Sequence, residues 1–315
     1  MSFKICDCNC RAEGVQCNPV KAVPAVTAQN TIGQRQPCGI VGVSMVAMRK
    51  IRIIKAVAIA TFKEWSAFRS HSMVSILVGP MFFAVQMIIW NAVYSGEEAI
   101  GGLSLQMMLG YYGISVLINY LVMDFADWNL QMLIHTGRYL TFALRPLHHR
   151  FFALSQKIGH RVLGLVFEFI PVSLILIFVF RINMAPASAP WFVLSVALSF
   201  LITFYINYSI GIMGFWLTKT RGIRGAIRLL VALSSGSLIP LSFFPAWCQT
   251  LFFVLPFQHT VYVPSMVFIG RYELAGVALP LPAVVGFQAV YALLMLMASE
   301  GLYRLGNRRF TAVGG

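Results

Sequence analysis

Six apolar stretches, each long enough to cross a lipid bilayer, constrain the fold of this chain more than any other feature. They lie at residues 73–94, 105–125, 162–180, 191–217, 229–244 and 282–303. A transmembrane helix needs about 20 mostly apolar residues. Only 11% of the chain is charged, against about 25% of an average soluble protein. The sequence therefore predicts an all-α polytopic membrane protein with six transmembrane helices.

The fifth stretch belongs to a longer interval that an ordinary transmembrane helix does not explain. No Lys, Arg, Asp or Glu occurs between Arg228 and Arg271. The interval nevertheless contains four prolines, which are Pro240, Pro245, Pro256 and Pro264. Irregular backbone at membrane depth requires protein or a water-filled cavity to satisfy its polar groups. We therefore expect a broken fifth span that lies along a transport path.

Basic residues lie mainly on one side of the predicted membrane. They concentrate in four segments, at residues 49–69, 138–161, 219–228 and 304–309. The opposite connections hold only Arg181 and Arg271. Because Lys and Arg accumulate in cytoplasmic loops, both termini are predicted to be cytoplasmic. The same topology explains the net charge of +14, so no nucleic-acid partner is expected.

The chain divides into three predicted regions. Residues 1–44 form a Cys-containing extension with no apolar run long enough for a signal peptide, and we predict that it is disordered. Its cysteines match no standard zinc spacing. They are Cys6, Cys8, Cys10, Cys17 and Cys38. Residues 45–71 combine basic residues with apolar residues at helical spacing, which predicts an amphipathic helix in the membrane interface. Residues 72–315 form the six-span domain, and Met1, Met45 and Met48 are alternative translation starts.

The sequence lacks the motifs of the common polytopic enzymes. It contains no His-Glu-x-x-His zinc motif, no Gly-x-Ser-x-Gly elbow and no Gly-x-x-x-x-Gly-Lys-Ser/Thr phosphate loop. We therefore expect no enzyme activity, no bound cofactor and no metal site in this chain.

Four acidic residues lie in or beside the predicted spans. Glu168 is the deepest, and acids inside a membrane are costly enough to be functional candidates. Three interpretations of Glu168 remain open: a structural ion pair with a basic residue on a neighbouring helix, a place in the lining of a polar path, and a proton carrier. Asp124, Asp127 and Glu300 lie near the predicted cytoplasmic surface, where we expect them to pair with Arg.

Several short motifs resemble those of one bacterial family. They are Ile-Pro-Leu-Ser-Phe-Phe-Pro at 239–245, Leu-Pro-Phe at 255–257, Phe-Ile-Gly at 268–270, Leu-Arg-Pro-Leu at 144–147 after Gly137, and the ending Arg-Arg-Phe-Thr-Ala-Val-Gly-Gly at 308–315. Their order over residues 53–315 is similar to that of ABC-2 type transporter permeases. The resemblance implies six spans per permease, two permeases per transporter and a separate cytoplasmic ATPase that binds ATP and Mg. It also implies export across the bacterial cytoplasmic membrane, with membrane lipids around the permease.

The resemblance also implies roles for particular residues. The segment that docks into the ATPase would comprise Gly137, Arg138, Tyr139, Leu140, Leu144, Arg145, Pro146 and Leu147. Outer re-entrant helices would form a gate at Pro240, Pro245, Pro256, Phe257 and Pro264. Span five would end at Pro240 and Pro245, and the small residues Gly211 and Gly236 would allow helices to approach closely. The alternative function is an ATP-independent, proton-coupled secondary transporter in which Glu168 carries the proton.

Overall fold

The computed structural model describes residues 39–66, 69–96, 99–144, 148–217 and 221–308. The chain divides into two units, Met1–Met45 and Val46–Gly315. Of the first unit, the structure describes only residues 39–45, which are helical. All five cysteines of the predicted extension therefore lie outside the described residues. The helix α1 (Gly39–Ser66) begins and ends earlier than the interface helix predicted at residues 45–71.

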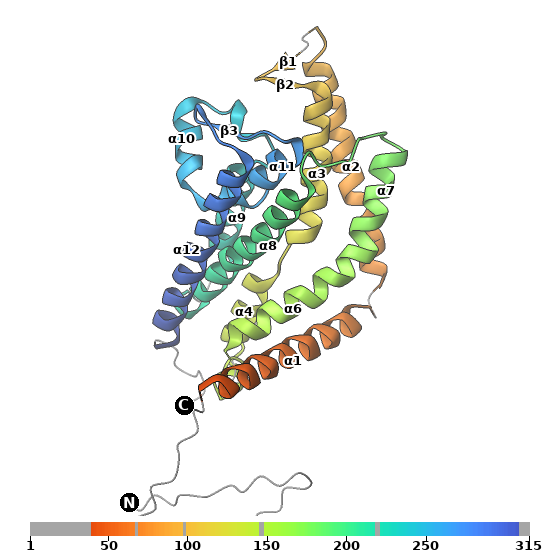
Figure 1. The fold of residues 1–315 in the computed structure, drawn as a ribbon. Coiled ribbons are helices and arrows are strands. Elements are labelled where there is room, and N and C mark those ends of the chain that lie inside the picture. The colour runs from red at the N-terminus through yellow and green to blue at the C-terminus, as the bar shows by residue number, and fades with distance from the viewer. Residues whose placement is uncertain (1–38, 67–68, 97–98, 145–147, 218–220, 309–315) are drawn as a thin grey trace, which may run out of the picture. The chain divides into compact units, whose positions relative to one another are not determined.

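The second unit is mostly helical (Figure 1). Its α-helices after α1 are α2 (Arg69–Val93), α3 (Leu105–Val122), α4 (Ala126–His135), α5 (Leu140–Ala143), α6 (His149–Gly164), α7 (Ile170–Phe178), α8 (Ala189–Ile212), α9 (Arg221–Ser234), α10 (Ala246–Val254), α11 (Tyr262–Ile269) and α12 (Leu281–Arg308). A π-helix, η1 (Leu165–Phe169), joins α6 to α7, and the 3₁₀ turns are η2 (Met213–Phe215), η3 (Leu241–Phe243) and η4 (Pro256–His259).

Five described segments are long and apolar enough to cross a membrane. They are Val74–Val93, Leu105–His135, His149–Phe178, Ala189–Phe215 and Leu281–Arg308. Each overlaps one of the predicted spans. The remaining predicted span, at residues 229–244, is not one continuous helix, because α9 ends at Ser234.

The turn after α9 explains why the helix ends before Pro240, where the sequence led us to expect the break. The hydroxyls of Ser235 and Ser237 both donate to the carbonyl oxygen of Ala232, each at 3.1 Å. Gly236 between them has a φ of +78°, a backbone conformation that residues other than glycine rarely adopt. Gly236 therefore serves a turn. A Cβ there would also lie 2.8 Å from the Tyr111 hydroxyl of α3 and 3.1 Å from the Tyr262 Cβ of α11, which supports the predicted close approach.

Carbonyl groups freed by this turn are satisfied by α3. The Tyr111 hydroxyl donates to the Gly236 oxygen at 2.6 Å, and the Tyr112 hydroxyl donates to the Leu238 oxygen at 3.0 Å. Both tyrosines are buried in the largest core cluster. An apolar environment requires such partners for irregular backbone, so α3 and the break after α9 stabilise each other.

Two glycines permit close helix crossings. A Cβ at Gly211 of α8 would lie 3.1 Å from the Leu130 Cβ of α4, which confirms the predicted close approach. A Cβ at Gly159 of α6 would overlap the Ala58 carbonyl oxygen of α1 and lie 2.8 Å from the Ala58 Cα. Only a residue without a side chain fits at this crossing.

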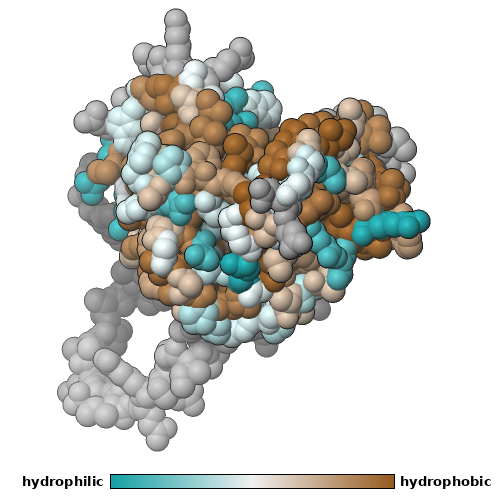
Figure 2. All heavy atoms as spheres, turned by 90° about the horizontal axis from the view of Figure 1, so that it is seen from above, coloured by the Kyte–Doolittle hydropathy of each residue, from teal (hydrophilic) through white to brown (hydrophobic). Residues whose placement is uncertain are grey.

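Two β-hairpins lie together at the end of the bundle opposite α4. The strands β1 (Ala99–Ile100) and β2 (Leu103–Ser104) form one hairpin, and β3 (Glu273–Leu274) and β4 (Val277–Ala278) form the other. The Arg271 guanidinium joins them by donating to the Gly102 carbonyl oxygen at 2.7 Å. Hydrophobic residues cover much of the surface seen from above, with hydrophilic residues among them (Figure 2).

Candidate functional site

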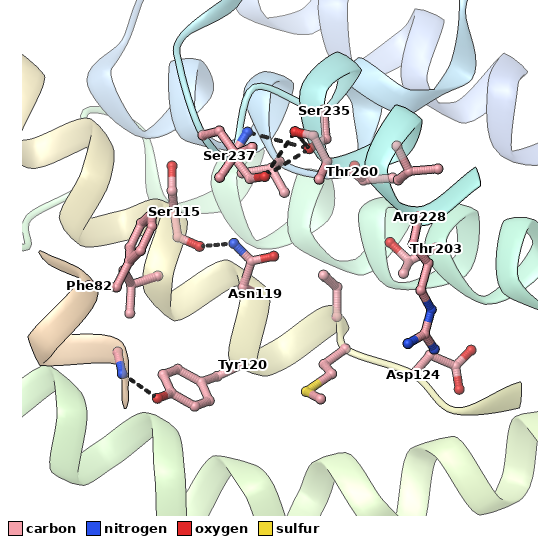
Figure 3. Close-up of a pocket in the computed structure, with 18 of the residues that line it drawn as sticks. Phe82, Ser115, Asn119, Tyr120, Asp124, Thr203, Arg228, Ser235, Ser237 and Thr260 are labelled. Carbon is pink, nitrogen blue, oxygen red and sulfur yellow. Dashed lines mark hydrogen bonds between the residues drawn. The ribbon is translucent and has the colours of Figure 1, made fainter. Parts of the chain in front are cut away.

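A cavity of about 830 Å³ lies between α2, α3, α8, α9 and the chain after α9 (Figure 3). Its apolar wall includes Val74, Val78, Phe82, Val116, Ile206 and Val231. Its polar wall comprises Ser75, Ser115, Asn119, Tyr120, Thr203, Asn207, Ser235, Ser237 and Thr260, together with the charged residues Asp124 and Arg228. Small-molecule sites in proteins typically occupy about 300–1,000 Å³, so this cavity could hold a ligand.

Two helices supply the same pair of polar groups to this cavity. Ser115 and Asn119 of α3, like Thr203 and Asn207 of α8, are four residues apart, a spacing that places both side chains on one helix face. The sequence interpretation missed these residues. A sequence pattern could have revealed them. Ser-Val-Leu-Ile-Asn-Tyr at 115–120 and Thr-Phe-Tyr-Ile-Asn-Tyr at 203–208 both begin with a hydroxyl residue and end in Ile-Asn-Tyr.

The hydroxyl of Tyr120 is inserted into the backbone of α2 beside the cavity. It donates to the Ser75 carbonyl oxygen at 2.5 Å and accepts from the Gly79 N–H at 3.0 Å. These two backbone groups would bond directly to each other in an uninterrupted helix. A Cβ at Gly79 would lie 2.7 Å from the Tyr120 ring, so glycine is required here. The next residue, Pro80, has no N–H to contribute to the helix.

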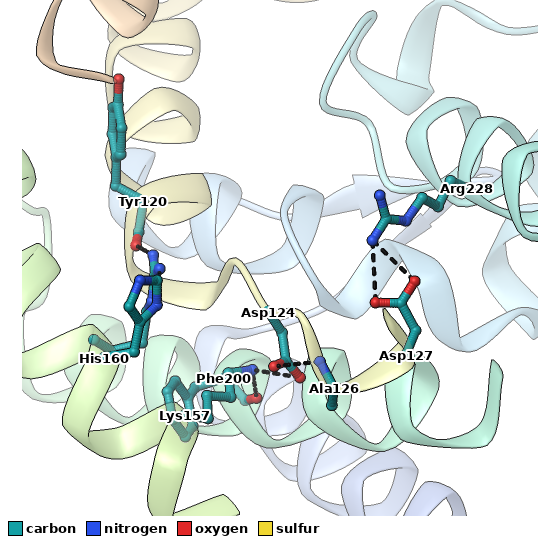
Figure 4. A network of polar contacts seen from close by, with 9 residues as sticks. Tyr120, Asp124, Ala126, Asp127, Lys157, His160, Phe200 and Arg228 are labelled. Atoms are coloured by element: carbon teal, nitrogen blue, oxygen red, sulfur yellow. Dashed lines mark hydrogen bonds and ion pairs between the residues drawn. The ribbon is translucent and has the colours of Figure 1, made fainter. Parts of the chain in front are cut away.

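Charged groups gather below the cavity, where α3, α6 and α8 meet (Figure 4). The buried Lys157 Nζ lies 3.8 Å from the Asp124 carboxylate and donates to the Phe200 carbonyl oxygen at 2.8 Å. The Asp124 carboxylate also accepts from the Ala126 N–H. A second cavity of about 420 Å³ shares Asp124 with the first and reaches Thr61 of α1.

The predicted partners of the acids near the membrane boundary are largely confirmed. Asp127 pairs with Arg228 and Arg224, at 2.9 and 3.8 Å. Glu300 pairs with Arg150 and Arg304, each at 2.8 Å. Asp124 pairs with Lys157, so the expectation of an Arg partner was wrong for this residue.

Glu168 lies in the π-helix η1 and is 9% exposed. Its carboxylate lies 3.9 Å from the Arg161 guanidinium, which supports the structural ion pair. The partner was predicted on a neighbouring helix, but Arg161 precedes Glu168 on the same run of helical residues. Glu168 does not line the 830 Å³ cavity.

The segment predicted to dock into the ATPase contains both buried and exposed side chains. Gly137, with a φ of +71°, follows the end of α4. Tyr139 is buried, and its hydroxyl lies 2.7 Å from the Tyr303 hydroxyl and donates to the Asn307 amide oxygen at 3.0 Å. Burial raises the pKa of Tyr139, so the hydroxyl stays protonated. Arg138, Leu140 and Leu144 are exposed, whereas Arg145, Pro146 and Leu147 lie outside the described residues.

The predicted gate residues stand at the beginnings of short helices. Pro240 precedes η3, Pro245 precedes α10, Pro256 begins η4 with Phe257 next, and Pro264 lies in the first turn of α11. Proline suits these places, because its φ fits a helix and the first turn needs no N–H partner. None of the five lines the 830 Å³ cavity, although Leu238, Thr260 and Val261 of the same interval do.

Comparison with protein families gives one match, to the ABC-2 family transporter protein model, over residues 81–314. A search of curated proteins finds no match. The matched region contains α3 to α12 and nearly all of α2, and therefore most of the cavity wall. The chain belongs to the ABC-2 family of transporter proteins and is a multi-pass membrane permease.

Proposed function

We propose that this chain is the permease subunit of an ATP-driven exporter in a bacterial cytoplasmic membrane and that the 830 Å³ cavity is part of its translocation path. The observation that carries this proposal is the cavity itself, which lies between α2, α3, α8 and α9 and is lined by both apolar and polar side chains. ATP and Mg would be bound by a separate ATPase. A second permease, either another copy or a related chain, would complete the transporter.

The end of the bundle that bears α4, α5 and the start of α6 would face the cytoplasm, with both termini. Arg138, Leu140 and Leu144 are exposed there and would contact the ATPase. Buried Tyr139 would not contact it directly, because its hydroxyl binds Tyr303 and Asn307 of α12. Tyr139 would instead hold the contact surface against α12.

The interval after α9 would complete the fifth of the six spans. In this proposal α9 enters from the cytoplasmic side, and α10, η4 and α11 form re-entrant segments in the outer half of the membrane. The outer gate would close where Arg271 joins the two hairpins. No observation favours proton-coupled transport, since Glu168 is paired with Arg161 and lies away from the cavity wall.

Copurification with a cytoplasmic ABC ATPase tests the proposal. Leu144 is 79% exposed, and apolar anchors at interfaces typically contribute about 1–2 kcal/mol or more. We therefore expect Leu144→Ala to reduce ATPase recovery and ATP-driven transport in proteoliposomes about tenfold. Leu293→Ala is the matched control, because Leu293 is 60% exposed on α12. Full transport without any ATPase would contradict the proposal.

A further inference from the structure

The polar wall of the cavity has an unusual balance of charge. Of the described residues that line it, Asp124 and Arg228 are the only charged ones, and both pair with residues outside the wall. Asp124 lies 3.8 Å from Lys157, and Arg228 donates two hydrogen bonds to Asp127. A charged ligand would lose its hydration on entering the cavity, and no charged side chain of the wall would be free to pair with it. Such a transfer is unfavourable in a partly apolar site.

Uncharged hydrogen-bonding groups, in contrast, are plentiful and partly unused. Asn119 donates from its Nδ2 to the Ser115 carbonyl oxygen at 2.9 Å, while more than a third of the residue remains exposed. Among the described residues, the buried Oγ1 of Thr203 has no hydrogen-bond partner. Asn207 lines the wall one turn further along α8. Unsatisfied polar atoms in a buried site indicate a missing partner such as a ligand or water.

The chemistry of these side chains selects a kind of ligand. A carboxamide both donates and accepts hydrogen bonds, so paired amides on α3 and α8 suit hydroxyl or amide groups. Val74, Val78 and Phe82 of α2 supply apolar surface beside them. We propose that the cavity binds amphiphiles with an uncharged, hydroxyl- or amide-bearing headgroup and that Asn119 and Asn207 hold this headgroup. This inference rests on the proposed function, because it assigns a substrate class to the same translocation path.

Binding to the full-length permease in lipid nanodiscs tests the inference. Three probes share an octyl chain: octyl glucoside is uncharged, octyl phosphate is anionic and octyltrimethylammonium is cationic. We expect octyl glucoside to bind most tightly. We also expect Asn119→Leu/Asn207→Leu to weaken its binding at least about tenfold, since two ordinary hydrogen bonds are lost, with octyltrimethylammonium binding changed by less than about twofold.

Two further variants keep the test decisive. Asn207→Asp adds a carboxylate to the wall, so octyltrimethylammonium should bind about tenfold more tightly if the side chain faces the ligand. This single variant decides the question if the double variant fails to fold. Asn91→Leu is the matched control, because Asn91 is exposed near the far end of α2 and bonds to its own helix at Met87. It should leave the binding of all three probes unchanged.

Tighter binding of either charged probe by the unsubstituted protein would overturn the inference. Unchanged glucoside binding in a folded double variant would also overturn it, as would unchanged cation binding in Asn207→Asp. The assay needs no ATPase, so failure of the proposed function is separately visible. Selective binding of octyl glucoside without ATP-driven transport would contradict the exporter function and support the binding site. ATP-driven transport by a protein that prefers a charged probe would support the exporter function and contradict the binding site.

Discussion

The guanidinium of Arg228 on α9 donates two hydrogen bonds to the carboxylate of Asp127 on α4, at 2.9 and 3.1 Å. Asp127 is fully buried, whereas about half of the Arg228 side chain is exposed. Arg228 also lines the 830 Å³ cavity. This pair therefore joins the helix that leads to the break with the helix that leads to the proposed coupling segment.

Removing Arg228 should destabilise the protein, because Asp127 would keep a buried charge with Arg224, at 3.8 Å, as its one remaining ion-pair partner among the described residues. Breaking a buried ion pair costs about 3–5 kcal/mol, and the exposure of Arg228 lowers our expectation for Arg228→Leu to about 1–3 kcal/mol. Denaturant unfolding in detergent would measure this change. In Arg228→Leu/Asp127→Asn the loss should be smaller than in Arg228→Leu alone, and a larger loss would contradict the pairing.

Gly236→Ala should strongly destabilise the break after α9. The φ of +78° strains any other residue, and the new Cβ would lie 2.8 Å from the Tyr111 hydroxyl. We expect a loss of about 2–4 kcal/mol from strain and the disturbed hydrogen bond. Gly225→Ala is the control, because a Cβ at Gly225 in α9 meets nothing within 4 Å. It should stabilise the helix by up to about 1 kcal/mol, so equal effects of both changes on the unfolding temperature would refute the prediction.

Gly159→Leu should force α1 away from α6, since no side chain fits against the Ala58 backbone. A cysteine at Thr61, which is buried at present, should then react faster with a soluble maleimide, by about tenfold or more. Gly301→Leu is the control, because a Cβ at Gly301 meets no atom within 4 Å. Unchanged labelling in Gly159→Leu would show that α1 does not cross α6 at this point.

Tyr120→Phe should destabilise α2 around Gly79. The hydroxyl satisfies both the Ser75 carbonyl and the Gly79 N–H, and leaving buried polar groups without partners costs about 1–3 kcal/mol. Amide hydrogen exchange at Gly79 should accelerate. Tyr291→Phe provides the comparison, because the Tyr291 hydroxyl bonds to the Val254 carbonyl oxygen in a more exposed place and should matter less. Slower exchange at Gly79 would mean that α2 closes its own hydrogen bond instead.

Tyr139→Phe should weaken transport more than it weakens the fold. The change removes the hydroxyl contacts to Tyr303 and Asn307, which in the proposed function would hold the exposed Leu140 and Leu144 in place. We expect a stability loss of about 1 kcal/mol and a several-fold fall in ATP-driven transport in proteoliposomes with the partner ATPase. Substrate binding in the absence of ATPase should be unchanged, and a parallel loss of binding would assign Tyr139 a different role.

Local patterns predicted several parts of the structure correctly. Five of the six apolar stretches overlap helical segments that are long and apolar enough to cross a membrane. Asp127 and Glu300 pair with Arg, as expected near the membrane boundary. Apolar length and the clustering of basic residues can be recognised without knowing how helices pack. The end of α9 was misplaced, because the prolines were taken as the breaks when Ser235, Gly236 and Ser237 form the turn.

The sequence by itself determined that this chain is a helical membrane protein, that one interval is irregular and that the chain resembles ABC-2 permeases. Each of these properties follows from hydropathy, proline positions or short motifs along the chain. Only the tertiary structure decided that Asn119 and Asn207 line one cavity, that Tyr120 interrupts α2 and that Tyr139 faces α12. These relationships depend on which faces of distant helices meet, and that is set by packing of the whole bundle.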